Sequence, residues 1–83
     1  MMKVVYFAWL RERIGLSEEV VDTGQMASVT DLIAHLQGLS EGHEMAFADM
    51  AAVRVAVDMK VTDFDASLAD AKEVAFFPPM TGG

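Results

Sequence analysis

One amphipathic segment sets the strongest limit on how this chain can fold. After Ser28, apolar residues recur at i, i+3, i+4, i+7 and i+10, forming the single helical stripe Val29, Leu32, Ile33, Leu36 and Leu39. Ser28 is a good N-cap. Asp31 lies near the positive end of the helix dipole, where an acidic side chain is favourable. Since 83 residues leave room for only one domain, we expect one main helix to cover one face of a small sheet.

The other apolar segments have the composition or the alternation of β-strands. Strands are predicted over residues 3–9, 17–22, 53–57, 59–62 and 73–77, with a single helical turn over residues 10–14 that ends at Gly15. Pro78 and Pro79 stop the last strand because proline donates no backbone hydrogen bond. The first and last strands are the most apolar and are placed side by side in the middle. The fold class is therefore α+β, a small mixed sheet under one main helix.

Residues 39–50 are ambiguous, since they fit a loop as well as a weak helical turn around residues 44–48. The chain divides into a folded domain over residues 1–77 and an extended tail over residues 78–83. No apolar run approaches the roughly 18 residues that span a membrane.

Composition narrows the classes of function. Thirteen acidic residues against six basic ones give a net charge of −7, which disfavours nucleic-acid binding. The chain has no cysteine, which excludes disulfides and thiolate metal sites and fits a cytoplasmic protein. His35 and His43 do not make a zinc site, and His43 is expected in an irregular segment. The seven methionines are expected to fill the core. No catalytic constellation or phosphate loop is present, so a carrier or adaptor is favoured over an enzyme acting alone.

The C-terminal tail carries the strongest functional signal. Two prolines stiffen its base, and the four residues beyond Pro79 reach about 13 Å when extended. Gly82 and Gly83 have no side chains, so they can enter a narrow channel. The Gly83 carboxylate is unhindered and ionised at neutral pH. Such a terminus suits adenylation by ATP, followed by displacement by a sulfur or amine nucleophile.

Residues 3–8, 10–12 and 55–57, and the ending Phe-Phe-Pro-Pro-Met-Thr-Gly-Gly over residues 76–83, resemble the small subunits of molybdopterin synthase. That family consists of ubiquitin-like sulfur carriers with a β-grasp fold. The resemblance extends over nearly the whole chain, and its ending is the most specific part. Two departures concern turns: family members often have Asn at position 58, here Asp58, and a glycine in the segment that here reads Asp-Ala-Lys-Glu over residues 70–73.

The resemblance implies a cycle and a set of partners. An activating enzyme would adenylate Gly83 with ATP and Mg²⁺, and a sulfur donor protein would convert the adenylate to a thiocarboxylate. The tail would then enter the active site of the large synthase subunit and deliver sulfur to a cyclic pyranopterin precursor, within a heterotetramer. This chain itself would bind no cofactor and no metal. Gly82 and Gly83 are the reacting end, and Pro78, Pro79, Met80 and Thr81 are expected to contact the partner.

Strand parity predicts a partner-binding surface beside the tail. Lys3 and Glu73 mark the outward faces of the first and last strands, so Phe7 and Phe77 are expected to share an exposed apolar patch. Val61 extends the patch by the family pattern. The alternative is that both phenylalanines pack under a loop such as residues 39–50.

Three other functions stay open. A thiamine-pathway sulfur carrier shares the fold and the tail chemistry. A ubiquitin-like modifier would join Gly83 to lysines of target proteins. A plain interaction domain would not use its tail.

Overall fold

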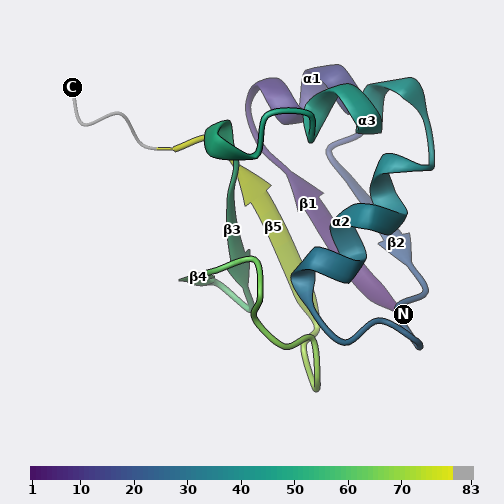
Figure 1. Ribbon diagram of the computed structural model, residues 1–83, viewed down its shortest axis with the longest axis vertical. Coiled ribbons are helices and arrows are strands. Elements are labelled where there is room, and N and C mark those ends of the chain that lie inside the picture. Colours follow the sequence, from purple (N-terminus) through teal and green to yellow (C-terminus); the bar gives the residue numbers. More distant parts are fainter. Residues whose placement is uncertain (80–83) are drawn as a thin grey trace.

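The structure is a computed structural model that describes residues 1–79. Its centre is a five-stranded mixed sheet with the order β2-β1-β5-β3-β4 (Figure 1). The strands are β1 (Met2–Tyr6), β2 (Glu18–Val21), β3 (Arg54–Val57), β4 (Lys60–Thr62) and β5 (Glu73–Phe77). β5 lies in the middle, parallel to β1 and antiparallel to β3. The predicted α+β class and the neighbouring first and last strands are confirmed.

The first strand is shorter than predicted. Residues 3–9 were expected to be extended, but Trp9 begins helix α1 (Trp9–Ile14). The chain turns out of the sheet at Ala8, the residue before Trp9, where the backbone has a φ of 56°. The end of α1 is as predicted, because Gly15 caps it in the left-handed region with a φ of 88°.

The main helix α2 (Val29–Gln37) starts at the predicted cap. The Ser28 hydroxyl accepts a hydrogen bond from the Asp31 N–H, and the Asp31 carboxylate accepts one from the Ser28 N–H. These two bonds form a capping box. Four residues of the predicted stripe are buried: Val29, Leu32, Ile33 and Leu36. Leu39 was wrongly placed on the stripe: it is exposed because the helix stops before Gly38.

Residues 39–50 are more ordered than the sequence indicated. They hold helix α3 (Glu41–Ala46), which Ser40 caps, and they lead into the short 3₁₀ helix η1 (Met50–Ala52). Phe47, at the end of α3, is buried edge-on against Phe76 of β5, with ring centroids 4.9 Å apart. The segment therefore contributes His43, Ala46 and Phe47 to the buried interior. The weak turn predicted at residues 44–48 was placed too late.

Two turns depart from the common chemistry of such turns. β3 and β4 are joined by Asp58 and Met59, with φ values of 49° and 70°. Aspartate is common at the first of these positions, whereas glycine is usual at the second, here Met59. Asp58 Oδ1 accepts hydrogen bonds from the backbone N–H groups of Lys72 and Glu73, which ties this hairpin to the start of β5. In the turn before β5 the left-handed residue is Asp70, with a φ of 62°.

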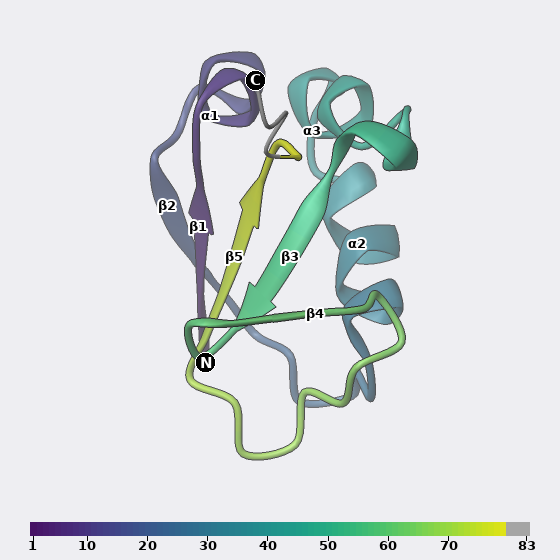
Figure 2. The same ribbon diagram turned by 90° about the vertical axis from the view of Figure 1, so that its left-hand side faces the viewer.

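The helices leave one face of the sheet open. Figures 1 and 2 show α2 packed along one face, where the alternate strand residues Val4, Tyr6, Val74 and Phe76 are buried. The other face, here called the open face, carries the intervening residues. Met1, Met45 and Met59 are exposed, so the methionines are not all core residues as expected. Within residues 1–79, no helix is both long enough and apolar enough to cross a membrane.

Candidate functional site

The base of the tail continues from the central strand. Phe77 ends β5 and lies opposite Arg54 of β3 in the register. On the other side, the Phe7 N–H donates to the Phe76 carbonyl oxygen at 3.0 Å. Pro78 and Pro79 follow and are partly buried. Phe76 and Phe77, directly before the prolines, are thus held on both sides. The predictions for Met80, Thr81, Gly82 and Gly83 lie outside the described residues.

The predicted parity of the two central strands is confirmed. Val74 and Phe76 of β5 are buried, whereas Ala75 and Phe77 point to the open face and are partly exposed. Phe7 follows the Tyr6–Phe76 register pair and is 49% exposed. The backbone therefore brings Phe7 and Phe77 side by side at the end of the sheet from which the tail emerges.

Val61 belongs to the same face. It pairs with Ala56, which pairs in turn with Ala75, and paired residues in antiparallel strands share a face. Val61 is 71% exposed. We call Phe7, Phe77, Ala75 and Val61 the open-face patch. Residues 39–50 do not cover it, because Phe47 packs against Phe76 on the opposite face.

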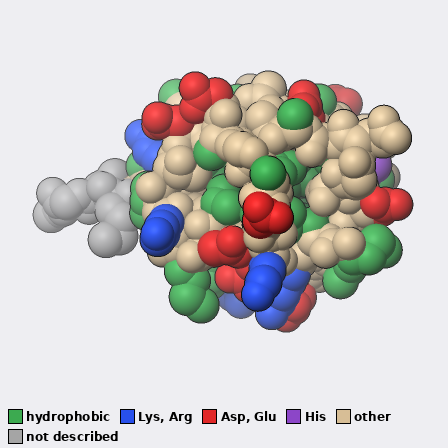
Figure 3. All heavy atoms as spheres, turned by 90° about the horizontal axis from the view of Figure 1, so that it is seen from below, with side chains coloured by type: hydrophobic (Ala, Val, Ile, Leu, Met, Phe, Trp, Pro, Cys, Tyr) green, Lys and Arg blue, Asp and Glu red, His purple; other side chains and the backbone are tan. Residues whose placement is uncertain are grey.

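Charged residues border the patch at the end away from the tail. Lys3 Nζ lies 3.4 Å from a Glu18 oxygen and 3.8 Å from a Glu73 oxygen. All three are at least partly exposed, so these ion pairs contribute little to stability. They mark the point where the apolar surface of β1 and β5 ends. Figure 3 shows acidic, basic and apolar side chains interspersed when the molecule is viewed from below.

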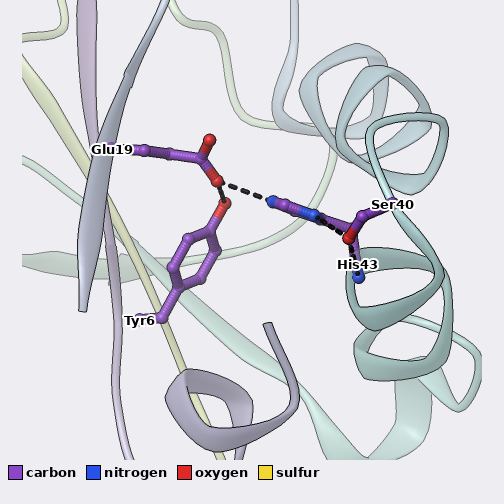
Figure 4. Close-up of polar contacts among 4 residues, drawn as sticks. All are labelled: Tyr6, Glu19, Ser40 and His43. Carbon is purple, nitrogen blue, oxygen red and sulfur yellow. Dashed lines mark hydrogen bonds and ion pairs between the residues drawn. The ribbon is translucent and has the colours of Figure 1, made fainter. Parts of the chain in front are cut away.

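A second cluster of polar side chains lies on the helix-covered face and was not predicted. The Tyr6 hydroxyl donates to Glu19 Oε2 at 2.7 Å, and His43 Nε2 contacts the same oxygen at 2.7 Å (Figure 4). His43 Nδ1 lies 2.7 Å from the Ser40 hydroxyl. His43 is only 5% exposed. The expectation of an irregular segment at His43 was wrong, because α3 carries this side chain into the core.

The chemistry of this cluster is that of an anchor between elements. Glu19 lies on the edge strand β2, Tyr6 on β1, and Ser40 and His43 on α3 and its cap. In the described part of the chain every buried side-chain nitrogen and oxygen has a partner. Burial, with the hydrogen bond to Glu19 adding to it, raises the pKa of Tyr6 well above its usual range. Tyr6 therefore stays protonated and continues to donate.

The sequence contains no local signal for this cluster. Glu19 is 13 residues from Tyr6 and 24 from His43. Only the capping pair Ser40 and His43, three residues apart, follows a recognisable local pattern. Within residues 1–79, no group of three or more His, Asp or Glu side chains is arranged to hold a metal ion.

Comparison with known proteins yields one family and several full-length relatives. The model of the ThiS family matches residues 4–83. The chain is 37% identical over 83 residues to the molybdopterin synthase sulfur carrier subunit of Escherichia coli (strain K12), and the match covers all of both chains. It is 30% identical over 84 residues to the protein of that name from Haemophilus influenzae, again over the full length of both.

Solved structures support the same β-grasp architecture. A putative molybdopterin converting factor, subunit 1, from Pyrococcus furiosus superposes with a TM-score of 0.73 and 30% identity, covering 95% of this chain and 97% of that one. SAMP1 from Haloferax volcanii gives a TM-score of 0.74 at 26% identity, covering 99% and 98%. The predicted ubiquitin-like fold and the predicted family resemblance are confirmed.

Proposed function

Because the chain belongs to the ThiS family, we propose that it is the sulfur-carrier small subunit of a molybdopterin synthase. The proposal follows the name shared by full-length relatives. It also follows the ending Gly82-Gly83, whose carboxylate is the group such a carrier needs.

The observation that carries the proposal is the position of the tail base. The central strand β5 leads directly into Pro78 and Pro79, next to the open-face patch of Phe7, Phe77, Ala75 and Val61. A partner that binds this patch would therefore receive the tail at the edge of its own interface. Aromatic residues beside a projecting segment are typical of protein interfaces.

The proposed chemistry uses the C-terminus alone. An oxygen of the Gly83 carboxylate attacks the α-phosphate of ATP, with Mg²⁺ in the activating enzyme, and pyrophosphate leaves. A sulfide equivalent from a sulfur donor protein then attacks the acyl carbon, and AMP leaves. The product is a thiocarboxylate, in which one oxygen of the terminus has been replaced by sulfur.

The thiocarboxylate then acts as a cosubstrate of the large synthase subunit. Its sulfur attacks a carbon of the cyclic pyranopterin precursor and displaces the oxygen bound to that carbon. Water then cleaves the acyl–sulfur bond, which leaves the sulfur on the pterin and returns the C-terminus to a carboxylate. The described residues of this chain contribute binding surface and direction to the tail. The large subunit contributes the catalytic side chains, and two copies of each subunit form the proposed heterotetramer.

Intact mass spectrometry tests the proposal directly. The purified chain is incubated with an activating enzyme, ATP, Mg²⁺ and a sulfur source, and then with a large subunit and the pterin precursor. We expect a mass gain equal to one oxygen-for-sulfur exchange, which disappears on addition of the precursor. Deletion of Gly83 is the control and abolishes both changes. Sulfuration of the pterin by the deleted chain would contradict the proposal.

A ubiquitin-like modifier is the second candidate. It is favoured by the likeness to SAMP1, one of whose solved structures is described as small archaeal modifier protein 1. The same incubation in a cell extract distinguishes the two, because a modifier would form conjugates with target lysines. The third candidate, a thiamine-pathway carrier, predicts the mass exchange without any transfer of sulfur to the pterin precursor.

A further inference from the structure

The topology separates the arginines of this chain from its lysines. β1 and β5 are parallel and end where the tail begins, and β3, antiparallel to β5, starts there. Arg11 and Arg13 on α1 and Arg54 at the start of β3 therefore lie at this end of the sheet, which we call the tail-exit end (Figure 1). Lys3, Lys60 and Lys72 lie toward the opposite end, at the start of β1, in the β3–β4 hairpin and just before β5.

Arg13 is exposed but held in place. Its guanidinium carbon lies 5.0 Å from the centroid of the Trp9 ring, a cation–π contact within one turn of α1. Trp9 and Arg13 line a surface hollow together with Met45 and Asp49. Met45 is exposed, so apolar surface lies beside the charge. An arginine fixed on an aromatic ring loses little conformational entropy when it binds.

Arg54 is fixed by a different mechanism. Its Nη1 donates to the carbonyl oxygens of Ala51 and Val53 at 3.1 and 3.0 Å. Its register partner is Phe77, so its side chain starts from the open face next to the tail base. The bonds to Ala51 and Val53 use Nη1 alone, and the guanidinium has further donors on its other nitrogens.

Acidic residues also lie at this end without neutralising the arginines. Glu12 is on α1 between Arg11 and Arg13, and Asp49 lines the same hollow as Arg13. None of the ion pairs found among residues 1–79 involves an arginine. The guanidinium groups are thus available to an external anion.

We propose that the tail-exit end binds an acidic protein surface on the enzymes that accept the tail, with Arg13 and Arg54 as its main contacts. This inference rests on the proposed carrier function. Any enzyme that takes the tail into an active site must face the end from which the tail emerges. A chain with a net charge of −7 places its fixed arginines at that end, so the mouth of the partner's site is expected to carry carboxylates.

The length of the tail decides which anion the arginines meet: carboxylates on the partner's surface or the phosphates of ATP. In an inserted, extended tail, four residues place the Gly83 carboxylate about 13 Å beyond Pro79. The phosphates that react with it are then a similar distance from the tail base. Arg54, beside Phe77, meets the rim of the partner's site and not the ATP.

Charge reversal with a matched control tests the proposal. The double variant Arg13→Glu/Arg54→Glu is compared with Lys60→Glu/Lys72→Glu, which changes the net charge equally at the opposite end. The rate of thiocarboxylate formation at low carrier concentration, and the affinity for a large subunit by titration calorimetry, are measured in about 0.1 M and about 1 M salt. At low salt we expect the arginine variant to form thiocarboxylate about tenfold more slowly and to bind the large subunit about tenfold more weakly. The lysine variant should stay near wild type, and the difference should shrink at high salt.

Further variants and outcomes keep the test decisive. Arg13→Gln/Arg54→Gln removes the two charges without adding acids, so it should lose less of the rate and of the affinity than the glutamate variant. Thermal melting checks that each variant folds. Equal losses in the arginine and lysine variants would overturn the tail-exit surface, because overall charge would then explain them. A wild-type chain that gains no sulfur would overturn the proposed function instead, and the large-subunit affinities would still decide the surface.

Discussion

At the scale of single residues, Tyr6 is a sensitive reporter of the polar cluster. It is the only tyrosine in the chain, and its buried hydroxyl donates to Glu19. Its pKa is raised by burial and by the carboxylate, so the folded state holds the neutral form more strongly than the unfolded state does. The stabilisation is complete below the unfolded pKa of about 10 and is lost as the pH rises above it.

We therefore predict a specific difference between wild type and Tyr6→Phe. At neutral pH the variant should lose about 1.5–3 kcal/mol of unfolding free energy, the value of a hydrogen bond to a charged group. Above pH 10 the wild type should lose up to about 1.4 kcal/mol more per pH unit than the variant. Urea unfolding from pH 7 to 11 measures both curves, and curves that stay parallel above pH 10 would contradict the prediction.

Met59 gives a second prediction at this scale. It has a φ of 70° in the β3–β4 turn and is 88% exposed, so it bears backbone strain without packing in the core. Since left-handed backbone costs about 1–2 kcal/mol for a residue with a Cβ, Met59→Gly should stabilise the fold by about 0.5–1 kcal/mol. Met45→Gly, within α3, is the control and should destabilise by about 1 kcal/mol. Chemical denaturation measures both, and a loss of stability in Met59→Gly would refute the strain argument.

At the scale of elements, the contact between α1 and α3 depends on one glycine. A Cβ added at Gly42 would overlap the carbonyl oxygen of Arg13, whereas one at Gly38 would lie at an ordinary 3.5 Å from the nearest atom. We predict that Gly42→Ala costs about 1–3 kcal/mol by forcing the two helices apart. Gly38→Ala should be neutral or slightly stabilising. Thermal melting of the two variants tests this difference. Equal effects would contradict the prediction, because α3 would then be able to shift away from α1 at no cost.

Helices α2 and α3 show which helices a sequence can predict and which it cannot. α2 has a long apolar stripe and a capping box, and it was predicted almost to the residue. α3 has six residues, and its buried positions His43 and Ala46 form no apolar stripe. Its stability comes from Phe47 on Phe76 and from the bonds of His43 to Glu19 and Ser40. Contacts of that kind leave no periodic signal.

At the scale of the whole molecule, two adjacent phenylalanines separate folding from partner binding. Phe76 is fully buried between the rings of Tyr6 and Phe47, and Phe77 is on the open face. Phe76→Ala should cost about 3–5 kcal/mol of stability. Phe77→Ala should change stability by less than about 1.5 kcal/mol but weaken binding to the large subunit by tenfold or more. Thermal melting and titration calorimetry on both variants measure this, and intact binding by Phe77→Ala would remove the open-face patch from the interface.

Local patterns in the sequence established most of the architecture. Composition, together with alternation over residues 53–57, identified every strand. The parity of β1 and β5 correctly placed Phe7 and Phe77 on one face, because a strand has only two faces. The chemistry proposed for Gly82 and Gly83 rests on the sequence alone, since an unhindered terminal carboxylate needs no partner from elsewhere in the chain. Such features depend on residues within a few positions of one another.

Only the tertiary structure decided which distant groups meet. It buried His43 against Glu19, placed the arginines of α1 and β3 at the tail-exit end of the sheet, and put Phe47 in the core against Phe76. Each of these depends on the order and direction of strands, which bring together residues far apart in the chain. Pairing of that kind is set by the packing free energy of the whole sheet, so it cannot be inferred from any short segment of the sequence.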